Sequence, residues 1–454
     1  MNVLMWYKRD LRVDDHPALT FAAGLGRVLP LYVAEPDYWA LPDTSARQWD
    51  FTAEALADLR HDLAGLGWPL ILRTGDAVEV LSRLCRQNAI TRIVSHQETG
   101  NAWVSARDQR VGDWARSAGI DWVQIPQSAV IAENSTTAPS FQPLPGVEPG
   151  DIPPARALRM QSDPCPHRQT GGRAQAYAQL GSFLEHRGAG YLRAMASPLT
   201  AERACSRLSP YIATGVISAR HIRQELAAKR ATRPGGAWGA NLRGFENRLS
   251  LRDQFIQKLK DAATFEPRAG CVTSGALMEA WAQGQTGFPF LDACMRYLTA
   301  SGWLNFHARA MLVSFATYYL RLDWRAVGHV LARRFTDYDP GIHWPQVELQ
   351  SGIADIDRMR VINPVKQGLE HDPNGTFTRR WVPELASVPD QFLHMPWVWP
   401  AAQSVLGRRY PEPIVDLTTA AKEAKAAISS LRRDTGPKPR RTRPAPFGQL
   451  VLDL

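Results

Sequence analysis

Short apolar runs alternate with longer amphipathic stretches over the first 130 residues. The runs show no regular polar alternation and stand at residues 2–7, 26–35, 68–75, 90–97 and 121–126. Strands that are apolar on both faces are typical of a parallel sheet covered by helices on both sides. The stretches between them, such as residues 46–67, repeat their apolar residues at helical spacing. We therefore predict an α/β, Rossmann-like amino-terminal domain over residues 1–130.

The composition changes after the last of these strands. Residues 131–170 are rich in Pro, Ser, Gly and Thr, which predicts a linker without a core of its own. Residues 171–430 then show helical patterns joined by loops, so the second domain is predicted to be all-α. Residues 431–454 carry Pro, Arg and Lys with few apolar residues. They predict a basic tail that either touches nucleic acid or is simply a solvated end.

The longest buried helical pattern lies within residues 281–364. The pattern breaks between Phe335 and His343, which places Asp337, Asp339 and His343 on a loop between buried helices. Such a loop is a place where a large polar cofactor could be held. Four tryptophans also stand in this region: Trp281, Trp303, Trp324 and Trp344. On spacing alone, tryptophans in helices are more often core residues than part of a cofactor site.

Charge and cysteine usage limit the possible classes of protein. The net charge of +9 makes a polyanionic partner plausible, although a basic surplus also serves solubility alone. The five cysteines form no CxxC pair, which argues against a disulfide framework or a structural zinc site. No run approaches the roughly 20 apolar residues of a membrane helix, and the charged start does not suit a signal peptide. We expect a cytoplasmic monomer that makes no membrane contact.

The amino-terminal domain lacks the usual dinucleotide fingerprint. The stretch GLGRV at residues 24–28 does not follow a first strand in the way that the fingerprint requires. This domain is therefore not predicted to hold a nicotinamide or flavin nucleotide.

Five segments resemble the photolyase/cryptochrome family. They are WYKRDLRVDDHPAL (6–19), TGFPFLDACMR (286–296), GWLNFHARAMLVSF (302–315), LDWR (322–325) and RVINPVKQG (360–368). The resemblance covers nearly the whole chain apart from the linker and the tail. It implies an α/β antenna domain followed by a helical domain that binds FAD. An iron–sulfur cluster, known in one branch of the family, needs about four thiolates, and we predict no metal.

The resemblance implies a set of FAD-binding residues. A serine-rich turn in the family binds the FAD pyrophosphate, and here it is formed by Ser206, Arg207, Leu208 and Ser209. Hydroxyls at a helix start are suitable phosphate donors, although by themselves they are more often an ordinary N-cap. Tyr191 is similar to a tyrosine that reaches the FAD phosphate. Arg309 and Asp337 resemble a buried ion pair, and Asp339 an aspartate that hydrogen-bonds the flavin ring.

This chain departs from the family pattern where DNA lesions are bound. Pyrimidine-dimer photolyases carry a Glu and a Trp at the positions of Arg248 and Leu251, so repair of a cyclobutane dimer cannot be carried over by analogy. Phe306 and His307 replace an Asn-Arg pair that contacts FAD and DNA. We take Arg248, Leu251 and His307 as candidate DNA-binding residues and Phe306 as a candidate FAD contact.

Photoreduction of the flavin in this family uses a chain of tryptophans. Trp344 and Trp324 match the proximal and middle members, whereas the distal position aligns near Cys271. A tyrosine (Tyr318 or Tyr319) or another tryptophan completes the route, or photoreduction is poor. The segment from Asp339 to Trp344 is shorter than usual, and His343 is the candidate to face flavin N5. His307 and His343 join the two tryptophans as candidate catalytic residues.

The resemblance leaves the antenna chromophore unknown. Folate-binding members place an Asn-Glu pair where this chain has Trp103 and Val104.

Two functions within the family are compared with a third outside it. The first is an enzyme, a blue-light-driven photolyase that repairs UV-induced pyrimidine lesions in single- or double-stranded DNA by electron transfer. The second is a cryptochrome, a blue-light receptor that signals through its flavin redox state. The missing lesion-facing residues favour the second, whereas the basic charge and the short tail favour the first. The third is an electron-transfer flavoprotein or a nucleic-acid-binding module without photochemistry.

Overall fold

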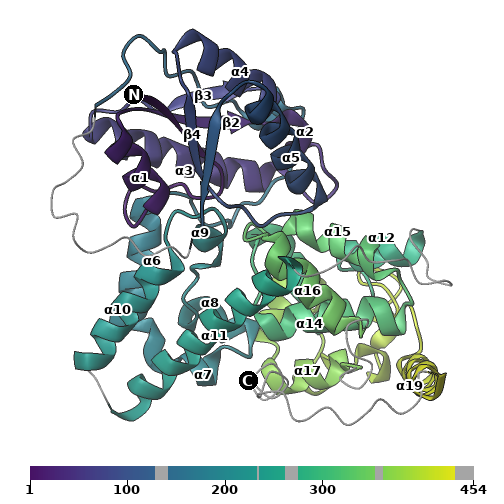
Figure 1. Ribbon diagram of the computed structural model, residues 1–454. Helices are drawn as coiled ribbons and strands as arrows, with labels where there is room; N and C mark the ends of the chain where they lie inside the picture. The colour runs from purple at the N-terminus through teal and green to yellow at the C-terminus, as the bar shows by residue number, and fades with distance from the viewer. Residues whose placement is uncertain (128–141, 233–234, 261–274, 353–360, 435–454) are drawn as a thin grey trace.

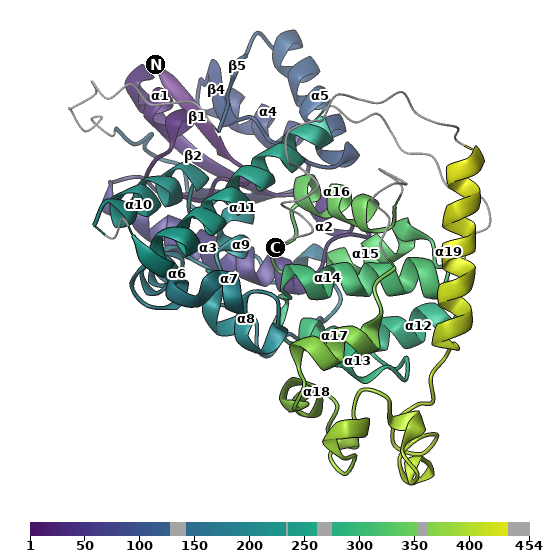
Figure 2. The same cartoon turned by 90° about the horizontal axis from the view of Figure 1, so that it is seen from below.

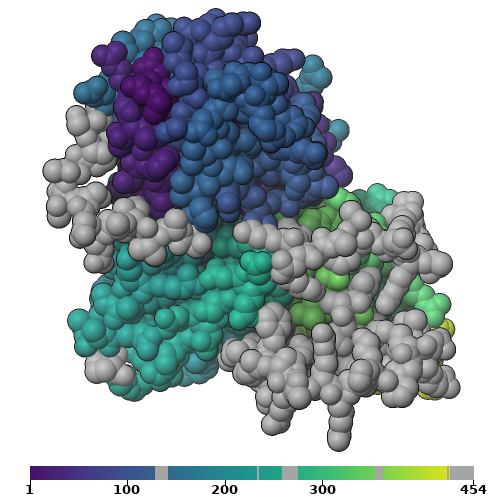
Figure 3. Space-filling model, viewed as in Figure 1, coloured from purple at the N-terminus to yellow at the C-terminus, as the bar shows by residue number. Residues whose placement is uncertain are grey.

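The computed structural model describes residues 1–127, 142–232, 235–260, 275–352 and 361–434. An α/β body and a larger helical body lie side by side (Figures 1 and 3). The predicted fold class is confirmed. Most of the expected basic tail, from residue 435 on, lies outside the described residues.

The α/β body contains a five-stranded parallel sheet in the order β3-β2-β1-β4-β5. The strands are β1 (Asn2–Tyr7), β2 (Arg27–Ala34), β3 (Ile71–Thr74), β4 (Arg92–His96) and β5 (Asp121–Ile125). The helices between them are α1 (Pro17–Leu25), α2 (Pro36–Trp39), α3 (Ala46–Gly65), α4 (Ala77–Gln87) and α5 (Ala102–Ser117). The central strand β1 lies between β2 and β4, so the chain reverses its direction of winding at this strand.

Both faces of the sheet are buried, which explains the unbroken apolar runs. Val3 and Met5 of β1 point to the face that shares a core with α1 and α3. Leu4 and Trp6 point to the other face, where they share a core with α4 and α5. Successive side chains of a strand alternate between the two faces, and here each face meets apolar helices.

The part of the predicted linker that the structure describes packs against the α/β body. The backbone N–H of Val28 donates to the Gln142 carbonyl, and that of Leu72 donates to the Pro149 carbonyl. Leu144 and Leu158 are buried. Proline lacks an N–H but keeps its carbonyl, so a Pro-rich segment can still cover a sheet edge as an acceptor.

The first helices of the helical body share their core with the α/β body, since Phe183, Leu226 and Leu249 belong to the same cluster as Val3 and Leu56. These elements are η1 (Ala155–Leu158), α6 (Arg173–Glu185), η2 (Arg187–Gly190), α7 (Tyr191–Ala194), α8 (Pro198–Ala204), α9 (Ser209–Ala213), α10 (Ala219–Thr232) and α11 (Gly236–Lys260).

The remaining elements form a second core around α13 and α14. They are α12 (Ala276–Gln283), α13 (Pro289–Ser301), α14 (Phe306–Ser314), the π-helix η3 (Phe315–Tyr319), α15 (Trp324–Arg334), α16 (Pro340–Gln350), α17 (Pro364–His371), α18 (Thr376–Trp381), η5 (Pro383–Leu385), η6 (Asp390–Phe392), η7 (Pro396–Val398), η8 (Ala402–Ser404) and α19 (Leu417–Asp434). Figure 2 shows α19 along the outer edge of this body.

The loop after β1 connects the two bodies. The Arg9 guanidinium donates to the carbonyls of Ala213 and Tyr338, and Arg12 donates to the Gly215 carbonyl. Gly215 has a φ of 71°, and a Cβ there would collide with the Arg9 carbonyl. Only glycine fits this close approach, which sets the α/β body directly against α9.

Candidate functional site

A cavity of about 250 Å³ opens in the helical body. Its wall is formed by residues from α7 to α9, from α11, from α14 and from the start of α16. The polar and charged residues that line it are Tyr191, Ser206, Ser209, Arg248, Arg252, Asn305, His307, Arg309, Asp337, Asp339 and Gln346. We call it the central cavity. Most of the predicted FAD-binding residues meet there, although they are spread over roughly 150 positions of the sequence.

Only two of the four predicted residues of the serine-rich turn line the cavity. Ser206 and Ser209 line the cavity. Arg207 has a φ of 59°, and its guanidinium lies 4.0 Å from the ring centre of Trp303, which itself lines the cavity. Leu208 is fully buried. Arg207 and Leu208 therefore support the wall from behind, and the two serines offer their hydroxyls to a ligand.

Another part of the cavity wall combines aromatic and basic side chains. Arg248 of α11 lies with its guanidinium 5.3 Å from the ring centre of Phe306, the first residue of α14. Tyr191 and Leu251 line the same cavity. Burial raises the pKa of Tyr191, and a hydrogen bond with Arg248 acts against that rise. The phenol of Tyr191 therefore stays neutral and can donate a hydrogen bond.

A buried ion pair lies in the cavity wall between α14 and the loop before α16. Arg309 Nη2 donates to Asp337 Oδ2 at 2.6 Å, and its guanidinium lies 3.9 Å from the ring centre of Phe335. Arg309 Nε donates to the Leu304 carbonyl at 2.7 Å. The other carboxylate oxygen, Asp337 Oδ1, is buried and has no hydrogen-bond partner.

Two further polar atoms of the cavity residues lack partners in the same way. Asn305 Oδ1 and His307 Nδ1 are buried without a hydrogen bond. Burial, with His371 and Arg248 nearby, lowers the pKa of His307 to about 4, so its ring is neutral at pH 7. Buried polar groups are normally hydrogen-bonded. Three unpartnered atoms beside one cavity fit a polar ligand that carries both donors and acceptors, as FAD does.

Asp339 stands at the other end of this wall. Its Oδ1 accepts the backbone N–H of Gly341 and caps α16, while its Oδ2 accepts Arg252 Nη2 at 2.8 Å. Arg9 of the α/β body lies 3.9 Å from Asp339. Arg252 was not predicted as a site residue. The sequence spacing could have indicated it: Arg252 follows Arg248 by four residues on one helix, and residues at this spacing share a helix face.

The face of helix α16 that lines the cavity is not the one that carries His343, which was predicted to face the flavin. Ile342 and Gln346 line the cavity, whereas His343 does not. The imidazole Nε2 of His343 lies 2.9 Å from the Gly328 carbonyl of α15, and burial lowers its pKa to about 4. His343 therefore packs against α15, and the residues that the helix offers to a ligand are Ile342 and Gln346. The sequence pattern alone did not indicate this rotation of the helix.

The two predicted electron-transfer tryptophans are neighbours. The rings of Trp324 and Trp344 lie edge to face with centres 6.1 Å apart. They connect α15 with α16, and neither of them lines the central cavity. The position near Cys271, where a distal donor would stand, lies outside the described residues.

Trp103 and Val104, the positions that the resemblance compares with a folate-binding pair, lie at the start of α5. Val104 is buried there, and Trp103 packs on Tyr38 with ring centres 5.5 Å apart. Apolar and aromatic side chains at these two positions supply no carboxylate or amide to a pterin, and the antenna chromophore is not identified.

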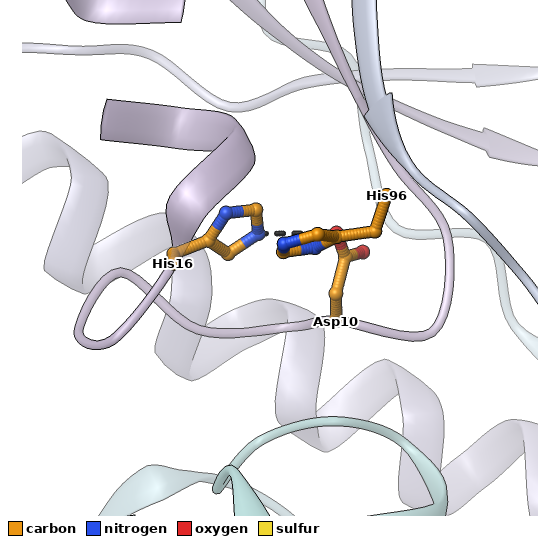
Figure 4. Close-up of side chains that lie close together, drawn as sticks. All are labelled: Asp10, His16 and His96. Atoms are coloured by element: carbon orange, nitrogen blue, oxygen red, sulfur yellow. Dashed lines mark hydrogen bonds and ion pairs between the residues drawn. The ribbon is translucent and has the colours of Figure 1, made fainter. Parts of the chain in front are cut away.

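A second polar cluster lies at the carboxyl end of the sheet (Figure 4). Asp10 follows β1, His16 precedes α1 and His96 ends β4, and each is about 1% exposed. Asp10 Oδ2 lies 2.7 Å from His96 Nδ1 and 3.1 Å from His16 Nε2. Burial by itself would raise the pKa of Asp10, but the two imidazoles hold it well below its usual range.

The donors of this cluster suit zinc, but the protonation of His16 does not. His16 Nδ1 accepts the backbone N–H of Leu19 at 3.0 Å. Burial, with His96 nearby, lowers the pKa of His16 to about 4, so the ring is neutral and carries its one proton on Nε2. Such a ring has no lone pair left for a metal. The cluster therefore joins α1, β1 and β4 through the hydrogen bond between His96 and Asp10, the cap of His16 on Leu19, and the close contact of His16 with Asp10.

Fold and cavity define a two-domain protein in which an α/β domain lies on a helical ligand-binding domain. The family model described as DNA photolyase matches residues 3–144, and the model described as the FAD binding domain of DNA photolyase matches residues 245–430. The chain belongs to the photolyase/cryptochrome family. The second match supports FAD as the ligand of the central cavity.

Relatives of both functional kinds resemble the chain over nearly its whole length. A deoxyribodipyrimidine photo-lyase of Vibrio cholerae is 30% identical and covers 91% of this chain and 96% of its own. A cryptochrome DASH of Gloeobacter violaceus is also 30% identical and covers 93% and 95%.

Solved structures resemble the fold closely. A Synechocystis cryptochrome has a TM-score of 0.83 at 23% identity and covers 94% of this chain and 98% of its own. A class III photolyase of Agrobacterium tumefaciens has a TM-score of 0.78 at 24% identity, with the same shares covered. Among the described residues, no helix combines the length and apolar character needed to cross a membrane.

Proposed function

We propose that the protein is a light-driven, FAD-dependent DNA photolyase that repairs UV-induced pyrimidine lesions. One observation carries this proposal: three buried polar atoms without partners, Asp337 Oδ1, Asn305 Oδ1 and His307 Nδ1, surround a cavity that basic and aromatic side chains also line. FAD, when bound, supplies light-driven one-electron chemistry. The protein supplies binding and orientation.

The side chains of the cavity divide into two groups by their chemistry. Ser206, Ser209 and Tyr191 offer hydroxyl donors suited to a pyrophosphate. Arg309 is held by Asp337 and by a backbone carbonyl, so its charge is fixed in place. Asp337 Oδ1 is left to accept a hydrogen bond from a ring N–H. A flavin ring beside this pair matches both the free acceptor and the fixed charge.

Arg248, Phe306 and His307 are suited to a damaged DNA strand. Arg248 neutralises a phosphate or stacks on a base, and Phe306 offers an aromatic face. A flipped nucleotide needs an aromatic or apolar surface to replace the stacking that it loses in the duplex. Phe306, under the Arg248 guanidinium, supplies such a surface although Leu251 stands at the family's tryptophan position.

The second candidate is a cryptochrome, and the character of α11 favours it. Arg248 and Leu251 leave this helix without the carboxylate and the aromatic ring that dimer photolyases place there. Relatives named as cryptochromes match as well as those named as photo-lyases. In this case the flavin redox state would alter contacts with a partner.

Light-dependent repair tests the two candidates. The reduced holoprotein is incubated with cyclobutane-dimer and (6-4) oligonucleotides, single- and double-stranded, in the light and in the dark. We expect repair of at least one lesion in the light only. No repair by protein that still photoreduces its FAD would overturn the photolyase proposal and favour the cryptochrome.

A further inference from the structure

A hydrogen-bonded chain leads from Trp344 out of the helical body into the α/β body. Trp344 Nε1 donates to the phenol oxygen of Tyr338 at 3.2 Å. The Tyr338 hydroxyl in turn donates to Asp43 Oδ2, a carboxylate on the loop before α3. Tyr338 is 7% exposed and Asp43 is 4% exposed. Indole, phenol and carboxylate therefore form one buried line across the interface.

Two histidines and two hydrogen-bond donors surround this line. His329 and His343 both lie beside the Trp344 ring, with ring centres 4.9 and 5.2 Å away. Burial lowers the pKa of both histidines, so neither adds a positive charge at pH 7. Arg9 Nη2 donates to the backbone carbonyl of Tyr338, and Asn101 Nδ2 lies 3.3 Å from Asp43 Oδ2. The Tyr338 proton already points at Asp43.

Burial and the nearby Asp43 charge raise the pKa of Tyr338 well above its usual value, so the resting phenol keeps its proton. A phenol that loses an electron becomes a strong acid. Its oxidation is therefore easy only where a base accepts the proton at the same moment, and a base within hydrogen-bond reach meets this condition. Tyr338 has such a base and also touches Trp344.

We propose that Tyr338 is the terminal electron donor of flavin photoreduction, with Asp43 as its proton acceptor. The inference rests on the proposed photochemistry: bound FAD would supply the light-driven one-electron oxidant, and the indole of Trp344 would carry the resulting radical cation. Tyr338 gives one electron to Trp344 while its O–H bond breaks and the proton moves to Asp43 Oδ2. The products are a neutral indole, a neutral tyrosyl radical and a protonated carboxyl, so charge and electrons balance.

This assignment places the terminal donor at the interface between the two bodies. Tyr319, by contrast, stacks on Phe315 with ring centres 5.2 Å apart in the helical core. The bond between Tyr338 and Asp43 also joins two bodies and stabilises their contact. A purely structural role would change stability and FAD occupancy but would produce no radical, and this difference makes the two roles separable.

Transient absorption and electron paramagnetic resonance of the FAD-loaded full chain test the proposal. In the wild type we expect an indole radical that decays as a neutral tyrosyl radical appears, more slowly in D₂O because a proton moves. Tyr338→Phe should abolish the tyrosyl signal and lengthen the indole lifetime by about tenfold or more. Asp43→Asn keeps a hydrogen-bond partner but removes the base, and it should act in the same direction.

Tyr410→Phe is the matched control. The Tyr410 hydroxyl donates to the buried Asp292 carboxylate, so this variant removes an equivalent phenol–carboxylate bond in another part of the core. We expect it to leave the radical signals unchanged. FAD content and thermal unfolding of all variants report any structural loss separately.

Two results would overturn the assignment of Tyr338 but not the proposed function. One is a tyrosyl signal that survives in Tyr338→Phe, and the other is a tyrosyl signal that disappears in Tyr319→Phe. If FAD is bound but no indole radical forms in the wild type, both this inference and the proposed photochemistry are wrong. A positive Tyr338 result without any lesion repair would instead retain the inference and reject the photolyase function.

Discussion

Arg309 and Asp337 form a 2.6 Å ion pair that uses only one of the two carboxylate oxygens. The other oxygen, Asp337 Oδ1, is buried and unpartnered beside the central cavity. The pair therefore both fixes a positive charge and leaves an acceptor for the ligand.

Asp337→Asn should lower FAD affinity by about tenfold or more, because it removes the charge that holds Arg309 and leaves one amide oxygen where the carboxylate offers two acceptors. Losing one partner of a largely buried pair typically costs a few kcal/mol, ~2–4 here, since Arg309 is partly exposed. FAD content after dialysis and thermal unfolding measure the two effects. Asp113→Asn, in an exposed pair with Arg116, is the control and should change neither. Unchanged FAD affinity would remove Asp337 from the site.

Arg248→Ala should weaken binding of lesion-containing DNA and reduce the slope of log K against log salt by about one, because one phosphate contact is lost. Fluorescence anisotropy at several salt concentrations measures both quantities. Arg116→Ala removes a charge of the same sign from the α/β surface and should leave the slope unchanged. Equal slopes for the wild type and Arg248→Ala would place the DNA elsewhere.

Trp324→Phe should slow flavin photoreduction strongly and leave FAD bound, because Trp324 contacts Trp344 and would share its positive charge until Tyr338 supplies the electron. Steady-state illumination followed by absorption spectra gives the rate. Trp122→Phe changes an indole that packs on Trp6 in the α/β body and should have no effect. Photoreduction at the wild-type rate would exclude Trp324 from the electron path.

The protein should lose stability as the pH falls from about 6.5 toward 4. His16 and His343 are buried with pKa values of about 4, whereas an unfolded histidine has a pKa of about 6.5. Between these values the unfolded chain binds protons that the folded chain does not, so unfolding becomes easier by up to about 3 kcal/mol per histidine.

Denaturant unfolding at pH 7 and at pH 4.5 measures this loss. His16→Asn keeps an acceptor for the Leu19 N–H but cannot take a proton, so its stability should fall less. An identical pH dependence in the variant and the wild type would show that His16 does not contribute.

Fold and family could be predicted from the sequence because they depend on local patterns. Runs such as residues 2–7 and 90–97 show no polar alternation. Such runs are typical of strands in a parallel sheet that helices cover on both sides. The serines of the 206–209 turn and Asp337 were also predicted from their motifs, and they line one cavity. Their binding roles remain predictions.

Side-chain direction at the site could not be predicted in the same way. Arg207 and Leu208 share the turn with Ser206 but support the wall from behind, and His343 packs on α15 while Ile342 and Gln346 line the cavity. Whether a helical side chain points into the cavity or away from it depends on how the helix packs against its neighbours. Spacing along one segment does not contain this information.

The sequence by itself determined the two-domain class, the family and the segments that form the central cavity, because these depend on periodicity and on contiguous motifs. Only the tertiary structure decided which atoms meet across the interface. Asp43 and Tyr338 are 295 positions apart and join through one hydrogen bond, and Asp10, His16 and His96 meet because parallel strands end at the same edge. Such contacts arise from the packing of separate elements, which no local pattern specifies.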